Sequence, residues 1–363
     1  EPIVSYRRRF RLASHALAEG ARYAGADFLF TPPPGLEELT KPSLSVIGTG
    51  KRVGKTAVGA TIGRLLDEEG RAPVMVCMGR GGPPEPHYVD PRNMSLDADA
   101  LLQVAGEGGH AASDYWEEAC LAGVPTIGCR RCGGGMGGTP ATSTGVQGAR
   151  MAEQSSHSPV IIEGSGATFA PIRTDARIVV VGAGQPEEDV TGYLGEYRLL
   201  TSDLAIVTMC EEPTASESRV QRLKENILRI NPDIEVALTV FRPHPLEPVA
   251  GKKVFLATSA PDSAARRIAQ DLENDHGCRV VDHSAHLAER EALRQELETG
   301  LGDCDVLLTE IKAGSIDVAV RAAVEKGVQP VFLHNRPVLV GGTVEGLRES
   351  IVTLCGRTEE MHG

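Results

Sequence analysis

The stretch VIGTGKRVGKTAVGATIGRLL, residues 46–66, joins a short apolar run to a glycine-rich turn, a Gly-Lys-Thr triplet and a helical repeat. In a strand, loop and helix of this kind, backbone N–H groups and the helix N-terminus surround a phosphate. The spacing departs from GxxxxGK[ST], because Thr49 stands where the first glycine is expected and Gly48 precedes it. Lys55 can reach the β and γ phosphates, and Thr56 can offer its hydroxyl to Mg²⁺. We therefore predict a nucleotide-binding loop that consists of Gly48, Thr49, Gly50, Lys51, Arg52, Val53, Gly54, Lys55, Thr56 and Ala57.

Short apolar runs alternate with helical repeats on both sides of this loop. Those between residues 43 and 245, such as SLSVIG, PVMVCM and PVIIEG, are typical of buried parallel strands. A second alternating set begins at 251, after the junction RPHPLEPVAG. The pattern predicts an α/β protein with a P-loop NTPase domain of mostly parallel sheet at 43–250 and a smaller α/β domain at 251–363. Residues 1–42 contain the breaker TPPPGLEELTKP, are too short to fold alone, and are expected to be the tail and linker of a truncated N-terminal domain.

The composition excludes several classes of function. Hydrophobic residues make up 41% of the chain, which is enough for globular packing, and the 41 glycines predict many tight loops. The formal net charge of −12 argues against general nucleic-acid binding, which needs a basic surface. There is no run of 18 apolar residues and no signal-peptide pattern at the start of the chain, so we expect a cytoplasmic protein that does not engage membranes.

A phosphate loop needs an acid at the end of a neighbouring strand to hold Mg²⁺. The segment PVIIEGSGA supplies Glu163 after an apolar run, followed by Gly164 in a turn that can approach phosphate. The alternative is that Glu163 merely ends a strand. Asp175 is either a second carboxylate of the site or a turn residue, and the sequence does not decide between these.

Three further segments place basic side chains beside glycines. Arg80 lies in CMGRGGPPEP, Arg130 and Arg131 lie in the expected loop GCRRCGGGMGG, and His110 precedes a helix start. Guanidinium groups flanked by glycine suit bidentate binding of phosphate, and two adjacent arginines suggest a ligand with more than one negative group. The alternatives are an exposed loop for the arginines and a structural role for His110.

Other polar residues remain open between scaffold and site. Cys129 and Cys132 have the spacing of half a zinc site, but the sequence offers no second half. In the second domain, LTEIKAGSIDVA carries Glu310 and Lys312 directly after an expected strand. Each is as compatible with scaffold as with a functional site.

The motifs GTGKRVGKTA, MGRGGP, HAASDYWE, TIGCRRCGGGM, IIEGSGA, VTMCEEP and FRPHPL, in this order, resemble the cyclic 2,3-diphosphoglycerate synthetase family. The resemblance extends from residue 48 to TEIKAGSIDVA, and the loop itself is similar to that of dethiobiotin synthetase-like P-loop ATPases. It implies an ATP-dependent ligase that forms the intramolecular phosphoanhydride of 2,3-diphosphoglycerate and releases ADP and phosphate. ATP and Mg²⁺ are the implied cofactors, 2,3-diphosphoglycerate is the small-molecule partner, and a homodimer is expected from similar enzymes.

Within this interpretation each candidate residue has an expected role. Lys55, Arg130 and Arg131 are the predicted catalytic residues, and Thr56 with Glu163 would hold the metal. Substrate binding is assigned to Arg80, His110, Arg130, Arg131 and Gly164.

Three rival functions share parts of this pattern. A dethiobiotin synthetase-like ligase that activates a carboxylate would use Lys55, Thr56 and Glu163 without paired arginines. A nucleotide-switch protein or metallochaperone would need an [NT]KxD motif, which the sequence lacks. A binding module that has lost turnover would keep the loop but release no phosphate.

Overall fold

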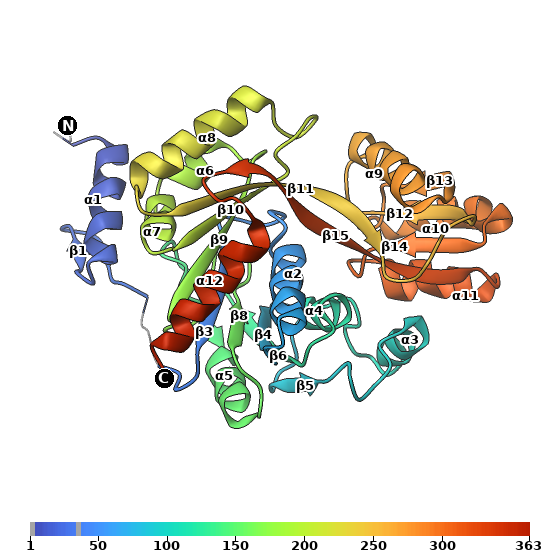
Figure 1. Ribbon diagram of the computed structural model, residues 1–363, viewed down its shortest axis with the longest axis horizontal. Helices are drawn as coiled ribbons and strands as arrows, with labels where there is room; N and C mark the ends of the chain where they lie inside the picture. The colour runs from blue at the N-terminus through green and yellow to red at the C-terminus, as the bar shows by residue number, and fades with distance from the viewer. Residues whose placement is uncertain (1–3, 34–37) are drawn as a thin grey trace.

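The computed structural model describes residues 4–33 and 38–363 of the chain. Within these residues the dominant feature is a 13-stranded sheet that extends across both lobes of the molecule (Figure 1). Its strand order is β13-β12-β14-β15-β11-β10-β9-β3-β8-β4-β6-β5, and β7 pairs with β6. The mixed α/β class predicted from the sequence is confirmed.

The first lobe contains a run of parallel strands that is covered on both faces. They are β3 (Ser43–Gly48), β4 (Val74–Gly79), β6 (Thr126–Cys132), β8 (Val160–Glu163), β9 (Ala176–Gly182) and β10 (Leu204–Thr208). Every residue of β3, β4, β8 and β10 is buried, which explains why these segments are mostly apolar. Because parallel strands end at the same edge, the loops that follow them converge there. The short antiparallel strands β5 (His87–Val89) and β7 (Thr142–Ser143) pair with β6.

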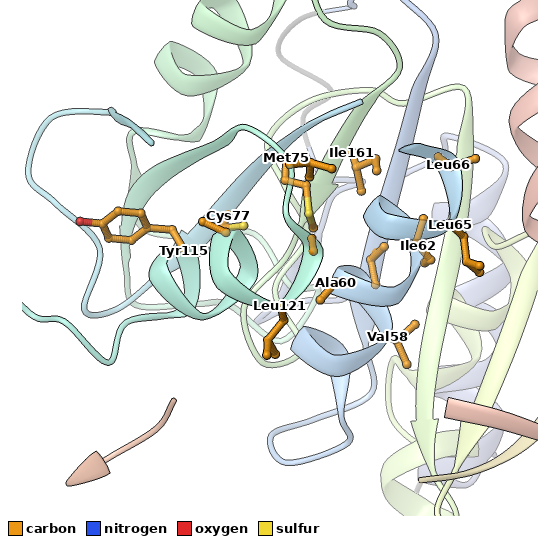
Figure 2. Close-up of a cluster of buried hydrophobic side chains, with 14 of the residues drawn as sticks. Val58, Ala60, Ile62, Leu65, Leu66, Met75, Cys77, Tyr115, Leu121 and Ile161 are labelled. Atoms are coloured by element: carbon orange, nitrogen blue, oxygen red, sulfur yellow. The ribbon is translucent and has the colours of Figure 1, made fainter. Parts of the chain in front are cut away.

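One face of this sheet carries helices α2 (Lys55–Glu68), α4 (Asp114–Ala122) and α12 (Leu347–Glu360), with α3 (Ala98–Gly106) beside them. Figure 2 shows Val58 and Ile62 of α2 in the same cluster as Met75 of β4 and Ile161 of β8. Small residues bring α2 close to α4: a Cβ built on Gly59 would lie 2.7 Å from Glu118 Oε1. The opposite face carries α1 (Tyr6–Ala18), α5 (Gly145–Gln154), α6 (Glu187–Thr191), α7 (Gly195–Leu200) and α8 (Glu217–Ile230).

The second lobe is a smaller parallel arrangement with its own core. Its strands are β12 (Lys253–Ala257), β13 (Arg279–Ser284), β14 (Val306–Thr309) and the first part of β15 (Gln329–Gly342). Helices α9 (Asp262–His276), α10 (Arg290–Gly300) and α11 (Arg321–Glu325), the 3₁₀ turn η1 (Leu301–Asp303) and the π-helical segment η2 (Ser315–Val320) complete it.

The two lobes are joined by a ribbon of two long strands. β11 (Glu235–Pro245) pairs antiparallel with β15 from Ala237 opposite Gly342 to Pro245 opposite Leu333. The first part of the expected junction RPHPLEPVAG is therefore strand. Its prolines are tolerated because the pairing of β11 with β10 ends at Leu238, so the later part of β11 has a neighbour on one side only.

The chain returns to the first lobe after this ribbon. Helix α12 packs on α2, β3 and β9, although residues 343–363 were expected in the domain 251–363. The division at residue 250 stays a proposal, and packing alone would group α12 with residues 43–250. At the other end, α1 packs on α7 and is followed by a hairpin of β1 (Tyr23–Ala24) and β2 (Leu29–Phe30). Residues 34–37 of the expected breaker lie outside the described residues.

Among the described residues, no helix combines the length and apolar character that a membrane span requires.

Candidate active site

The predicted phosphate loop connects β3 to α2 and has the backbone conformation that its sequence suggests. Arg52 and Gly54 have positive φ values of 60° and 85°. A Cβ built on Gly54 would lie 2.4 Å from Phe241 Cζ, so only glycine fits there without displacing that ring. The buried Val53 anchors the loop, because its carbonyl accepts a hydrogen bond from Thr208 Oγ1 at 2.8 Å.

The structure explains both departures from the usual motif, the glycine at position 48 and the threonine at position 49. A Cβ built on Gly48 would lie 2.7 Å from Lys55 Cδ, so the lysine side chain runs back across Gly48. Thr49, which replaces the usual first glycine, donates from Oγ1 to Gln185 Oε1 at 2.5 Å, and the same oxygen accepts the Gly182 N–H at 3.0 Å. The glycine is needed at position 48, while the threonine ties the loop to the turn after β9.

Lys55 is the central cation of the site. Burial lowers its pKa, and the carboxylates of Glu163 and Asp114 oppose that effect. The positive charges of Arg131 and Lys312 also lower the pKa of Lys55. Two further cations therefore lie within electrostatic range of Lys55. A loop with several cations around one lysine is suited to a polyanionic ligand.

Glu163 ends β8 beside the helix that begins with Lys55. Thr56 Oγ1 lies 3.4 Å from Glu163 Oε1, so the structure brings the two predicted metal ligands together. Burial raises the pKa of Glu163, whereas a hydrogen bond with Glu118 and the charge of Lys55 lower it. Hard oxygen donors of this kind are the ligands that Mg²⁺ prefers, so Thr56 and Glu163 fit this ion.

Glu118 and Cys77 lie directly behind Glu163. Ligand atoms of the three buried residues are within 4.8 Å of one another. Burial, followed by the charge of Glu163, raises the pKa of Glu118 well above its usual range, which favours a neutral Glu118 beside the Glu163 carboxylate. Burial also raises the pKa of the Cys77 thiol, which remains neutral within the apolar cluster of Figure 2.

Arg131 approaches the loop from the end of β6. Its Nη2 donates to the carbonyl and hydroxyl oxygens of Ser165 at 3.0 and 3.1 Å, and Nη1 donates to the Gly133 carbonyl at 2.8 Å. A Cβ built on Gly166 would lie 3.5 Å from Arg131 Nη2 and 3.9 Å from Lys51 Cγ. Arg131 and Lys51 therefore flank the turn that follows Glu163.

Arg130 lies on the other side of the strand. The expected loop at residues 128–138 is strand as far as Cys132, which corrects the sequence-based interpretation. Successive side chains of a strand point to opposite faces, so Arg130 is exposed while Arg131 is buried. Arg130 Nε donates to the Gly82 carbonyl at 2.7 Å, away from the contacts of Arg131.

The remaining predicted substrate residues surround the same edge of the sheet. Arg80 is exposed in the turn after β4, and its charge contributes to lowering the pKa of Arg131. His110 is exposed and lies against the same turn, because a Cβ built on Gly81 would be 3.3 Å from His110 Cδ2. Gly164 is buried, and its N–H donates to the Val46 carbonyl at 2.9 Å.

Two open questions of the sequence are settled by position. Asp175 accepts hydrogen bonds from Ser43 N and Oγ, both at 2.8 Å, at the edge of the sheet opposite the phosphate loop, so it is a structural residue. Cys129 is buried and Cys132 exposed on one strand, and neither belongs to a group of three metal-ligating side chains within residues 4–33 and 38–363.

Sequence reasoning missed the acidic face of α4. Asp114, Glu117 and Glu118 share one helix face at the spacing i, i+3, i+4, and this periodicity is the signal that could have found them. Asp114 Oδ2 lies 2.9 Å from a Cβ built on Gly79, at the end of β4. Glu117 and Glu118 are 3% and 0% exposed, which is unusual for carboxylates without a specific role.

Comparisons with known proteins agree along the chain. Models of the P-loop, C-terminal and N-terminal domains of cyclic 2,3-diphosphoglycerate synthetase match residues 43–240, 245–336 and 1–31. The cyclic 2,3-diphosphoglycerate synthetase of Rubrobacter xylanophilus is 48% identical over 98% of this chain and 80% of that protein. The one of Methanothermobacter thermautotrophicus is 43% identical over 98% of this chain and 77% of its own length.

A solved structure shares the fold. LpxK from Aquifex aeolicus, crystallised in complex with ATP, has a TM-score of 0.54 over 97% of this chain and 96% of its own, at 12% identity. This is a likeness of fold alone. The matching domain models and the identity to full-length relatives confirm the resemblance seen in the motifs, and the chain belongs to the cyclic 2,3-diphosphoglycerate synthetase family.

Proposed function

We propose that this chain joins the two phosphates of 2,3-diphosphoglycerate into a cyclic anhydride at the expense of ATP, with release of ADP and phosphate. The observation that carries the proposal is the position of Lys55, which lies back across Gly48 in a phosphate loop with Arg131 in electrostatic range. The substrate bears two phosphates and a carboxylate, and a cluster of cations in a chain of net charge −12 suits it.

The reaction needs two displacements at phosphorus. An oxygen of one substrate phosphate attacks the γ-phosphorus of ATP, and the bond to the ADP oxygen breaks. An oxygen of the second substrate phosphate then attacks the activated phosphorus of the first, the ring closes and inorganic phosphate leaves. Such transfers depend mainly on positioning and charge stabilisation, so no strong base is required.

Each residue has a place in this scheme. Residues 48–57 would hold the nucleotide phosphates, and Lys55 would stabilise the transferring group. Thr56 and Glu163 would hold Mg²⁺, which supplies charge neutralisation when bound. The substrate would be held by Arg80, His110 and Arg131 together with the turn at Gly164. Arg130 is left out of this set because it faces away from Arg131.

The proposal is tested by incubating the protein with MgATP and 2,3-diphosphoglycerate and following the phosphorus NMR spectrum. An upfield anhydride signal that grows with ADP is expected, and Lys55→Ala should abolish both. Absence of both signals with the wild-type protein would exclude the proposed reaction. Formation of ADP with a carboxylic acid other than diphosphoglycerate would favour the dethiobiotin synthetase-like alternative.

A homodimer and a cytoplasmic location belong to the same proposal. The dimer is tested by analytical ultracentrifugation, where a sedimenting mass near 38.5 kDa would exclude it.

A further inference from the structure

The second lobe contributes one cation to the edge of the first. Lys312 follows β14, and its Nζ lies 3.1 Å from Oε1 of Glu117 on α4. Glu117 is on the same helix face as Asp114, which approaches the end of β4, and Glu118, whose carboxyl group lies close to that of Glu163. The contact therefore connects the smaller lobe to the acidic helix that borders the phosphate loop.

The loop that carries Lys312 is held in a defined conformation. Glu310, two residues earlier, accepts from Ser259 Oγ at 2.6 Å and from Asn335 Nδ2 at 2.8 Å. The Gly314 N–H donates to the Leu287 carbonyl at 3.0 Å, and Ala313 has a positive φ of 50°. A non-glycine residue in this conformation costs free energy, which is typical of loops that must present a particular side chain.

Charge explains why a lysine is held here. Burial raises the pKa of Glu117, and the Lys312 ammonium, 3.1 Å away, is the leading influence that lowers it. For Lys312 burial lowers the pKa, but Glu117 and Glu310 together raise it above the usual value, so the ammonium keeps its charge. An ion pair in which one side chain is 39% exposed adds little net stability, so stability alone does not account for this one.

The Lys312 side chain also remains accessible to a ligand. Its side chain is 39% exposed, while that of Glu117 is 5% exposed, so one side of the lysine remains open. Its charge acts on both Lys55 and Asp114. Lys55 begins the helix that follows the nucleotide loop, whereas Lys312 comes from the other lobe.

We infer that Lys312 is a substrate-binding residue that contacts a phosphate or the carboxylate of 2,3-diphosphoglycerate, and that Glu117 is the positioning residue that aims it. This inference rests on the proposed function. In this arrangement the smaller lobe takes part in substrate binding, because the cationic side chains that bind the substrate come from both lobes. Lys312 would act on the diphosphoglycerate and leave nucleotide binding to residues 48–57.

The test compares Lys312→Ala, Lys312→Arg and Glu117→Gln with the wild-type protein. Calorimetry measures the Kd of 2,3-diphosphoglycerate and of MgATP separately, and steady-state assays measure kcat and KM for both. Loss of one charged contact predicts a rise of about 10- to 100-fold in the Kd and KM of diphosphoglycerate for Lys312→Ala. The Kd of MgATP should stay within about twofold, and Lys312→Arg should recover most of the lost affinity.

Lys253→Ala is the matched control, because Lys253 forms an ion pair with Asp303 in the same lobe at 2.9 Å. It should leave both affinities unchanged. Glu117→Gln should raise the Kd of diphosphoglycerate by less than Lys312→Ala, because the Lys312 ammonium remains but is no longer held in place by a carboxylate. Thermal unfolding of every variant shows whether it is folded, and a misfolded Lys312→Ala is replaced by Lys312→Met.

The inference is overturned if Lys312→Ala and Lys312→Met bind diphosphoglycerate as the wild-type protein does, or if MgATP binding weakens to the same extent. Equal losses of thermal stability in Lys312→Ala and Glu117→Gln with unchanged affinities would make the pair a structural clasp. The binding measurement does not require turnover: a wild-type protein that binds diphosphoglycerate without closing the ring would refute the proposed function, and the comparison of variants would still decide the role of Lys312.

Discussion

The Lys55 side chain lies back across Gly48, with Cδ 2.7 Å from the place where a Cβ at position 48 would be. The same Cβ would lie 3.0 Å from the Gly166 carbonyl oxygen, in the turn after the strand that carries Glu163. Position 48 is thus the point at which the lysine, the nucleotide loop and the turn beyond β8 meet. The glycine that is displaced in the sequence motif therefore occupies a crowded point of the loop.

Gly48→Ala should therefore move Lys55 while leaving the fold in place. We expect a loss of stability of about 1–3 kcal/mol from overpacking. ATP-dependent phosphate release should fall about 100-fold, since small displacements of a positioned group cost that much. Gly356→Ala in α12 is the control, because the nearest atom to its Cβ is the end of the Arg71 side chain at 3.9 Å. Equal activity of the two variants would contradict the proposed position of Lys55.

Arg131 and Arg130 should differ strongly, although the sequence alone treats them alike. Arg131→Gln should raise the KM of diphosphoglycerate about 10- to 100-fold with MgATP binding retained, because it removes one charged partner. Arg130→Gln should change the KM by no more than about threefold, since its guanidinium is already bound to the Gly82 carbonyl and faces away from Arg131. Initial-rate kinetics on both variants decide this, and similar KM values would show that the strand bends enough to use both residues.

Glu163→Gln tests the metal site. Replacing the charged carboxylate should raise the Mg²⁺ concentration for half-maximal phosphate release by about 10- to 100-fold. Excess EDTA should stop phosphate release by the wild-type protein, and added Mg²⁺ should restore it. Asp175→Asn is the control, because Asp175 lies at the opposite edge of the sheet and binds Ser43. An unchanged Mg²⁺ requirement in Glu163→Gln would remove this residue from the metal site.

The buried proton on Glu118 should appear in the pH dependence of stability. Glu118 has a strongly raised pKa in the folded protein, whereas the unfolded chain releases this proton above the ordinary value of 4.5. The folded state then binds more protons, so this group contributes stability that declines as the pH rises from about 5.

Glu118→Gln removes this proton and keeps the size of the side chain. Between pH 6 and 8, the wild-type free energy of unfolding should fall more steeply than that of the variant, by up to about 1.4 kcal/mol per pH unit. Urea unfolding followed by the fluorescence of Trp116 in the nucleotide-free protein measures both slopes. Parallel slopes would mean that Glu118 is ionised in the folded protein.

Local sequence patterns were sufficient to predict where the phosphate loop and Glu163 lie in the fold. The loop at residues 48–57 could be predicted because strand, glycine turn and helix follow one another directly, so their geometry depends on neighbours in sequence. Glu163 could be predicted because the carboxyl ends of parallel strands meet at one edge, and Thr56 does lie 3.4 Å from it. The family resemblance follows from the order of such local motifs.

Only the tertiary structure decided the remainder. Residues 126–132 form a strand because they pair with β4 and β7, although their glycine-rich neighbourhood suggested a loop. As neighbours in a strand, Arg130 and Arg131 point to opposite faces of the sheet. The return of α12 to the first lobe depends on the β11–β15 ribbon, whose strands are distant in sequence. The contact between Lys312 and Glu117 joins two lobes, and no spacing within either segment encodes it. The sequence by itself determined the elements with short-range periodicity, and the fold decided which charged side chains from distant elements share the same buried, weakly screened edge of the sheet.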